Sequence, residues 1–505
     1  MKHFLQNLKY DLPAGLVVFF VALPLCLGIA LASGAPLFSG IISGIVGGVF
    51  VGAISGSKVG VSGPAAGLAT IVFAYIASLG GSFSAFLTAV VLMGVIQLAL
   101  GIMRLGSIAY YFPSSVIKGM LCGIGILIII KQLPHAFGFY GDFPRDFAIE
   151  AIQVSPGILH FLNEKLDIHA ILISAFSLAL MIIFETSFIK KFSFTKVIQA
   201  PLLVVAVGIL LNQFLPLEEH QIVAIPVAAN AAEFFSQFAR PDFSQLNNPN
   251  IYVMALVMAL VASIETLLCV EACDKIDPEK NITPTNRELK AQGLGNILSG
   301  LIGGLPITQV IVRTSANISF GAKSKAATIF HGILLLVCAI TIPGLLNQIP
   351  LASLACILLV VGYKLAKPQI FIKIYKLKSE QFTPFILTIL GMIFFDLLKG
   401  VGIGLAAACA FVLYNNFRNS FSKFQDKEIG ENIHKIELCE EASFLNKGAI
   451  LQLLKDIPPH SKVFIDASRS KSIHYDIIEM IHDFKIHARA NNIKVQTKGL
   501  TLKKI

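Results

Sequence analysis

The sequence predicts an all-α polytopic membrane protein with fourteen transmembrane segments in a seven-plus-seven inverted repeat, followed by a small cytoplasmic α/β domain. The 505 residues are 55% hydrophobic and only 14% charged, with a mean hydropathy of +0.75. Soluble domains carry about a quarter charged residues. Two apolar segments, one in each half of the chain, are broken by glycine and proline at corresponding places. Positive charge gathers in alternate loops.

Seven apolar stretches lie before residue 216, and we expect each of them to be helical. A full span needs about 20 residues, so the shorter stretches cross only part of a bilayer. The second stretch is rich in glycine, which lets helices approach each other closely. The stretches cover residues 13–31, 36–54, 64–78, 84–103, 115–130, 169–184 and 198–215.

Seven more stretches follow residue 250, so that the two repeats cover about residues 10–216 and 250–415. The third stretch of this half is a short helix that begins at or after Pro306. The others cover residues 251–273, 289–302, 326–346, 350–365, 384–398 and 401–414.

The third and tenth stretches are the candidates for the binding site. Gly63 and Pro64 precede one, and a Gly-Gly-x-Pro break at residues 303–306 precedes the other. Such breaks end one helix and let another start. The first N–H groups of a new helix lack partners, and its positive dipole end favours an anion. The candidate anion ligands are Ser62, Ala65, Ala66, Thr308, Gln309, Val310, Ile311, Val312 and Arg313.

Glu265, in the eighth stretch, is the candidate site for a coupling ion. A carboxylate within a membrane is costly unless it pairs, takes up a proton or binds a cation. We therefore expect Na⁺ or H⁺ to act there. The alternative is a structural ion pair with Arg313, which is also a candidate anion contact.

Enzymatic and nucleic-acid functions are not indicated. No nucleophile–base pair, phosphate loop or metal cluster is found, so we expect neither catalytic residues nor a bound cofactor. The net charge of +10 comes from short loops between spans, which argues against nucleic acid as a partner. Of the eight cysteines, Cys269 and Cys273 lie one helical turn apart, but no histidine or third cysteine joins them.

Loop charge predicts that both termini are cytoplasmic, in the cytoplasmic membrane of the cell. Basic residues follow the even-numbered stretches, whereas acidic loops follow the fifth and seventh. The acidic residues include Asp142, Asp146 and Glu150. The basic ones are Lys190, Lys191, Lys196, Lys323, Lys325, Lys364, Lys367, Lys373, Lys376, Lys378, Arg418 and Lys423.

The composition changes after residue 415, where the membrane domain, residues 1–415, is expected to end. Residues 416–429 are interpreted as a linker and 430–505 as a small domain. Apolar strands are expected at 462–466 and 493–496, with a helix over 473–490 between them. Helix between strands indicates an α/β module.

Five of these segments, in order along nearly the whole chain, resemble the SulP (sulfate permease) family of inorganic anion transporters. The resemblance rests on Leu23-Pro24-Leu25, Val61-Ser62-Gly63-Pro64, Val116-Ile117-Lys118-Gly119, Ile264-Glu265-Thr266-Leu267-Leu268, and the set Asn296, Gly300, Gly303, Gly304, Pro306, Arg313 and Thr314. It implies a core domain that moves against a gate domain, a homodimer in the lipid membrane, and an anion held between the two half-helices and the first span. The C-terminal module would then be a STAS domain, truncated after Gly499.

Two departures from the family bear on the substrate and on coupling. Leu25 stands where many members have glutamine, which resembles the bicarbonate-transporting branch. That branch binds Na⁺ through a threonine where this chain has Cys269. The sequence thus leaves bicarbonate and sulfate, and Na⁺ and H⁺, as alternatives. A nucleobase–proton symporter of the same fold, or a sensor or scaffold that acts through the C-terminal domain, are the other hypotheses.

Overall fold

The computed structural model describes residues 2–106, 113–138, 167–186, 199–227, 231–395, 397–418, 421–428 and 431–500. The acidic residues Asp142, Asp146 and Glu150, and the basic residues Lys190, Lys191 and Lys196, lie outside the described residues. Two compact units are found, one of Met1–Lys376 with Thr388–Val401 and one of Leu377–Leu387 with Gly402–Ile505.

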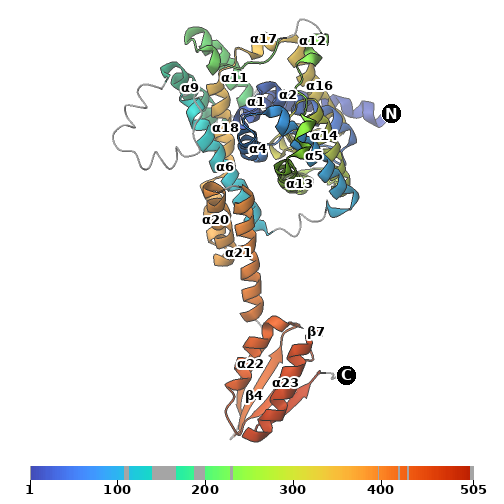
Figure 1. Cartoon of the computed structure of the whole chain (residues 1–505), viewed down its shortest axis with the longest axis vertical. Coiled ribbons are helices and arrows are strands. Elements are labelled where there is room, and N and C mark those ends of the chain that lie inside the picture. Colours follow the sequence, from blue (N-terminus) through green and yellow to red (C-terminus); the bar gives the residue numbers. More distant parts are fainter. Residues whose placement is uncertain are drawn as a thin grey trace. The chain divides into compact units, whose positions relative to one another are not determined.

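Each apolar stretch of the first half contains a helix (Figure 1). The second helix is continuous through a π-helical turn, η1 (Val46–Val51), because two glycines there tolerate the wider turn. α6 runs six residues beyond its expected end. The helices are α1 (Lys2–Ala32), α2 (Leu37–Ile45), α3 (Gly52–Ile54), α4 (Ala69–Ser78), α5 (Phe83–Ile102), α6 (Ser114–Ala136), α9 (Ile168–Glu185) and α11 (Ala200–Phe214).

The second half repeats this pattern. α16 ends at Thr341, earlier than expected, because Pro343 cannot continue a helix and begins a short one of its own. The helices are α13 (Pro249–Ile276), α14 (Thr285–Leu301), α15 (Ile311–Ser319), α16 (Lys325–Thr341), α17 (Pro343–Leu346), α18 (Leu351–Leu365), α20 (Ser379–Phe394) and α21 (Leu397–Arg418). Two short helices, α12 (Ala231–Ser236) and α19 (Pro368–Tyr375), were not expected.

Seven helices of the described part are long and apolar enough to cross a membrane. Five others are apolar but shorter, between 10 and 17 residues. Fourteen spans therefore remain a prediction. Two of these seven helices, α5 and α13, pack against α14.

The prediction of an all-α membrane part is wrong at one place. The strands β1 (Ser62–Pro64) and β2 (Ile307–Gln309) form an antiparallel pair, with Gly63 opposite Thr308. The physical reason is that broken backbone at membrane depth must find hydrogen-bond partners within the protein. Each break supplies the partners of the other.

The helices of the first unit pack in two groups. α6, α9, α11 and α18 pack on one another, while α2, α5, α13, α14, α15 and α16 form a larger group, and α1 contacts both groups. Glycines permit the closest contacts. A β-carbon on Gly125 of α6 would meet the carbonyl oxygen of Gly362 of α18 at 2.6 Å, and one on Gly94 of α5 would meet that of Gly293 of α14 at 2.7 Å.

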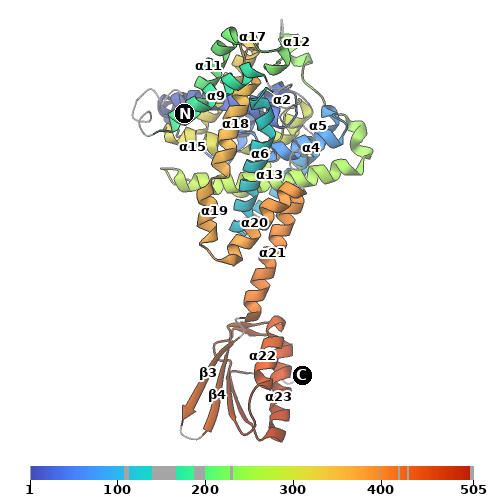
Figure 2. The same ribbon diagram turned by 90° about the vertical axis from the view of Figure 1, so that its left-hand side faces the viewer.

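The C-terminal region is a four-stranded sheet covered by helices on one face (Figure 2). The strand order is β3-β4-β6-β8, with β3 antiparallel to β4 and the other pairs parallel. The elements are β3 (Phe421–Glu428), β4 (Glu431–Leu438), α22 (Lys447–Lys455), β6 (Lys462–Asp466), α23 (Tyr475–Ala488) and β8 (Lys494–Lys498). The expected strands and helix are found, but the prediction of a linker over residues 416–429 is wrong in part. Residues 421–428 form an edge strand. The sequence did not indicate it, because edge strands often carry charged residues and this one carries several.

Candidate functional site

The β1–β2 pair brings the two broken segments together with a local two-fold relation. The N–H of Val310 donates to the carbonyl of Val61 at 2.9 Å, and the N–H of Ala65 donates to that of Pro306 at 3.4 Å. The two bonds are equivalent: in each, the residue after one strand binds the residue before the other. A helix then starts from each end of the ribbon, at Ala66 in η2 (Ala66–Leu68) and at Ile311 in α15.

Helices cover the ribbon on two sides. α1 contacts β1, α4 and α15, and α13 contacts η2, β2 and α15. The first and eighth stretches therefore both lie against the two half-helices. This juxtaposition brings Glu265, on α13, to the start of the first half-helix.

Accessibility divides the predicted anion ligands into two sets. Ser62, Ala65, Thr308 and Gln309 are at most 3% exposed. Ala66 and Val310 are partly exposed, and Ile311 and Val312 are 37% and 42% exposed. The starts of the helices are thus more exposed than the ribbon itself.

The backbone amides of Ala65 and Val310 are already used by the ribbon. These two amides therefore hold the ribbon together, and the roles of Ala65 and Val310 as anion ligands stay predictions. The amides that follow them, in the first turn of each helix, have no partner within the helix. Those of Ala66, Ile311 and Val312 belong to the predicted set, whereas the Gly67 N–H donates to the Glu265 carboxylate.

Among the predicted side chains, Ser62 points toward α14, where its hydroxyl oxygen accepts a hydrogen bond from Gln292 Nε2 at 2.7 Å. Thr308 Oγ1 and both polar side-chain atoms of Gln309 are buried without a hydrogen-bond partner. A buried hydroxyl or amide without a partner is costly. These groups are free to accept or donate a bond to a ligand or water.

Glu265 lies against the first half-helix. A β-carbon on Gly67 would come within 2.7 Å of Glu265 Oε2, so only glycine lets the carboxylate approach the backbone there. Oε2 is buried and has no hydrogen-bond partner. A buried carboxylate with one oxygen left unpaired has the properties expected of a cation or proton site.

Arg313 is fully buried, and its guanidinium group lies near Cys26 and Gly63 rather than beside Glu265. Its Nη2 donates to Cys26 Sγ of α1 at 3.4 Å, and Nε and Nη1 have no hydrogen-bond partner. Nη1 lies 2.1 Å from where a β-carbon on Gly63 would be. Opposite residues of an antiparallel pair share a face, so the Thr308 side chain lies on this face as well. The alternative ion pair between Arg313 and Glu265 is not formed.

Sequence reasoning missed a buried polar stripe on α14, formed by Glu288, Gln292, Asn296 and Ser299. All four are 0% exposed. Their spacing of three to four residues places them on one helix face, which was the available signal.

The stripe holds both breaks in place. Glu288 accepts from the Ser55 hydroxyl at 2.5 Å and from the N–H of Gly56 at 3.1 Å. Asn296 accepts from the N–H of Ile307 at 2.6 Å and donates to its carbonyl at 3.0 Å. The irregular backbone is thereby satisfied without water.

The comparisons with known proteins agree with this architecture. Residues 8–388 match the model of the sulfate permease family. This chain belongs to that family. It is a multi-pass integral membrane protein of a transporter family, not an enzyme family.

Three members show how far the likeness extends. YvdB of Bacillus subtilis (strain 168), which is named as a sulfate transporter, is 27% identical over 410 residues, 81% of this chain and 74% of that protein. The bicarbonate transporter BicA of Picosynechococcus is 27% identical over 414 residues, 80% and 70% of the two chains. The solved structure of the murine Solute Carrier 26 family member A9 anion transporter matches the fold with a TM-score of 0.77 at 17% identity, covering 98% of this chain and 86% of that one.

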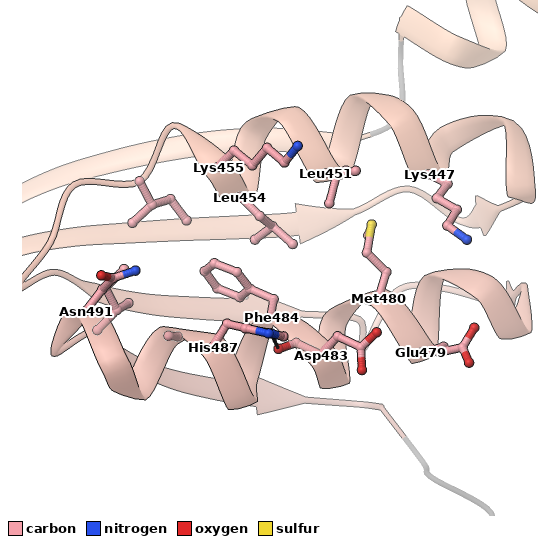
Figure 3. Close-up of a pocket in the computed structure, with 13 residues that line it drawn as sticks. Lys447, Leu451, Leu454, Lys455, Glu479, Met480, Asp483, Phe484, His487 and Asn491 are labelled. Carbon is pink, nitrogen blue, oxygen red and sulfur yellow. Dashed lines mark hydrogen bonds between the residues drawn. The ribbon is translucent and has the colours of Figure 1, made fainter.

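This sulfate permease family member has a separate hollow in its C-terminal region, with a volume of about 510 Å³ between α22 and α23 (Figure 3). Leu454, Met480 and Phe484 form its apolar floor. Lys455 and Asp483 lie on opposite walls. No element of the ribbon or of α13 lines it, so it is not part of the site described above.

Proposed function

We propose that this protein is a secondary active transporter of a small inorganic oxyanion, bicarbonate or sulfate. The observation that carries the proposal is the β1–β2 ribbon, from whose two ends the half-helices start. Two helix N-termini supply unpaired N–H groups and positive dipole ends in one region, which suits an oxyanion. The exposed first turn at Ile311 and Val312 gives access.

Bicarbonate and sulfate are the two candidate substrates. Relatives of similar identity are named for each anion. Leu25, which is buried at 5% exposure, offers no polar group from the first span. Bicarbonate is a smaller anion with fewer oxygen atoms to satisfy, and this apolar surface slightly favours it.

Coupling is assigned to Glu265. Na⁺ prefers several oxygen ligands, and Cys269, one turn further along α13, offers sulfur instead. A proton needs only the carboxylate. We therefore favour H⁺ over Na⁺ as the coupling ion, with protonation of Glu265 at the start of the first half-helix.

Transport is proposed to proceed by alternating access between the two helix groups. The larger group, which holds the ribbon, corresponds to the core domain, and the group of α6, α9, α11 and α18 to the gate domain. Fourteen spans in two inverted repeats, cytoplasmic termini, a STAS-like C-terminal domain and a homodimer in the cytoplasmic membrane complete the proposal.

The test is uptake of labelled bicarbonate and labelled sulfate into proteoliposomes that contain the purified protein. Imposed proton and Na⁺ gradients are compared for each anion. We expect a proton gradient to drive accumulation of one anion above its external concentration. Accumulation driven only by Na⁺ would contradict the assignment of the coupling ion, and no uptake of either anion would contradict the function.

A further inference from the structure

Two thiols form a close pair near the proposed coupling site. Cys269 and Cys273 lie one turn apart on α13, and their sulfur atoms are 3.6 Å from each other. They are 7% and 1% exposed. Both are reduced and free of disulfides. The proposed transport mechanism uses neither of them.

The separation matches the geometry of a shared metal ion. Two sulfur atoms bound to one tetrahedral ion at about 2.3 Å each lie about 3.8 Å apart. The observed 3.6 Å is within a few tenths of an ångström of that value. No backbone movement is needed to bring the two ligands to one ion.

The charges around the pair favour a cation. Cys269 lies within electrostatic reach of two carboxylates, Glu265 on its own helix and Glu288 on α14. The amide side chain of Gln309, whose oxygen has no hydrogen-bond partner, belongs to the strand whose backbone binds Thr266 of α13. Val59 and Ile318 belong to the same buried apolar cluster as the two thiols.

We propose that Cys269 and Cys273 bind a thiophilic divalent cation of the Zn²⁺ and Cd²⁺ class. Each thiol loses a proton on binding, and the two thiolates neutralise the charge of the ion. Thiolates select soft cations over the Na⁺, Mg²⁺ and Ca²⁺ that prefer oxygen. Water or a neighbouring oxygen completes the tetrahedron, because the described residues supply only these two strong ligands at this place.

Occupation of this site inhibits transport. The ion ties together two turns of α13 directly after Glu265, where the helix also packs on α15 and β2. This inhibitory effect rests on the proposed function, whereas the binding of the ion does not.

Binding is tested with Cd²⁺ alone on the purified, reduced protein in detergent. Sulfur-to-cadmium charge-transfer absorption measures the stoichiometry and the affinity. We expect one tight ion per chain. Cys269→Ser and Cys273→Ser each remove chelation and weaken binding by a factor on the order of 10². Cys338→Ser and Cys356→Ser, which change buried thiols on other helices, are the matched controls and leave binding unchanged.

A second measurement on the unmutated protein guards against variants that misfold. The protein is loaded with Cd²⁺, unfolded rapidly and alkylated, and the labelled cysteines are identified by mass spectrometry. Protection confined to Cys269 and Cys273 supports the site. Protection of other cysteines, or affinity unchanged in Cys269→Ser and Cys273→Ser, overturns it. Binding without loss of anion uptake overturns only the inhibitory effect.

Discussion

At the scale of single residues, Glu265 and Gly67 form the contact on which the coupling proposal depends. The glycine lets a carboxylate reach the backbone of the first half-helix, and Oε2 is left without a partner. A group held in this way is ready to bind a proton or a cation, because one of its oxygen atoms is buried without a partner and no basic side chain pairs with it in the described residues.

Glu265→Gln keeps the size of the side chain and removes its charge. We expect accumulation of the anion against its gradient to fall to background, because no coupling ion binds. Gradient-driven uptake into proteoliposomes measures this. Glu271→Gln is the matched control on the same helix, since Glu271 forms an exposed ion pair with Lys275. Exposed pairs contribute little, so its uptake stays within about twofold of the unmutated protein. Full uphill uptake by Glu265→Gln would contradict the coupling role.

Single residues were predicted from the sequence only in part. The type and depth of Glu265 indicated a site, and the structure brings it to the half-helix. The direction of Arg313 was not predictable, because a helical position does not tell which side of a ribbon its long side chain reaches. The hydrogen bonds of the Ala65 and Val310 amides were not predictable either, since the sequence did not indicate that two distant breaks pair as strands.

At the scale of elements, α14 positions the site without belonging to it. Its polar stripe satisfies the backbone before each half-helix, as in the two hydrogen bonds between Asn296 and Ile307. Glycine and proline indicated the two breaks in the sequence. The polar stripe of α14, which binds them, was not recognised because the hydropathy of this helix is average. A helix periodicity analysis that looked for polar stripes would have found it.

Asn296→Leu removes both bonds to Ile307 and the bond to Gln97, and it keeps the number and branching of the side-chain heavy atoms. Each buried backbone group left without a partner costs about 1–3 kcal/mol, so the free energy of unfolding falls and the apparent melting temperature in detergent drops. Leu294→Ala is the control on the same helix, because Leu294 is 39% exposed. We expect a clearly smaller change for it. Equal melting temperatures for the two variants would show that α14 does not hold the break.

At the scale of the whole molecule, the packing separates a transporting unit from the C-terminal α/β region. Within the described residues each predicted apolar stretch contains a helix, because hydrophobic length and Gly/Pro breaks are local signals. The strand pairing and the edge strand over 421–428 depend on residues far apart in the chain, and local patterns did not show them.

Deletion of residues 419–505 tests whether transport needs the C-terminal region. We expect the shortened protein to retain anion uptake into proteoliposomes, because the ribbon, Glu265 and α14 all lie in the other unit. Size-exclusion chromatography verifies that it is folded. A folded but inactive protein would favour the hypothesis of a sensor or scaffold that acts through this region.

The proposed anion site depends on the amides at the start of the half-helices. Ile311 is the first residue of α15, where proline is well tolerated, and Val310 before it has the extended conformation that precedes proline. Ile311→Pro therefore removes one N–H and leaves the helix intact. Ile311→Ala is the matched control, because it removes the side chain and keeps the N–H.

The most direct measurement is the half-saturating anion concentration for uptake by these two variants. A hydrogen bond to a charged group contributes about 1.5–3 kcal/mol. We expect Ile311→Pro to weaken apparent affinity by about tenfold or more relative to Ile311→Ala. Equal affinities of the two folded variants would contradict an anion site at the start of α15.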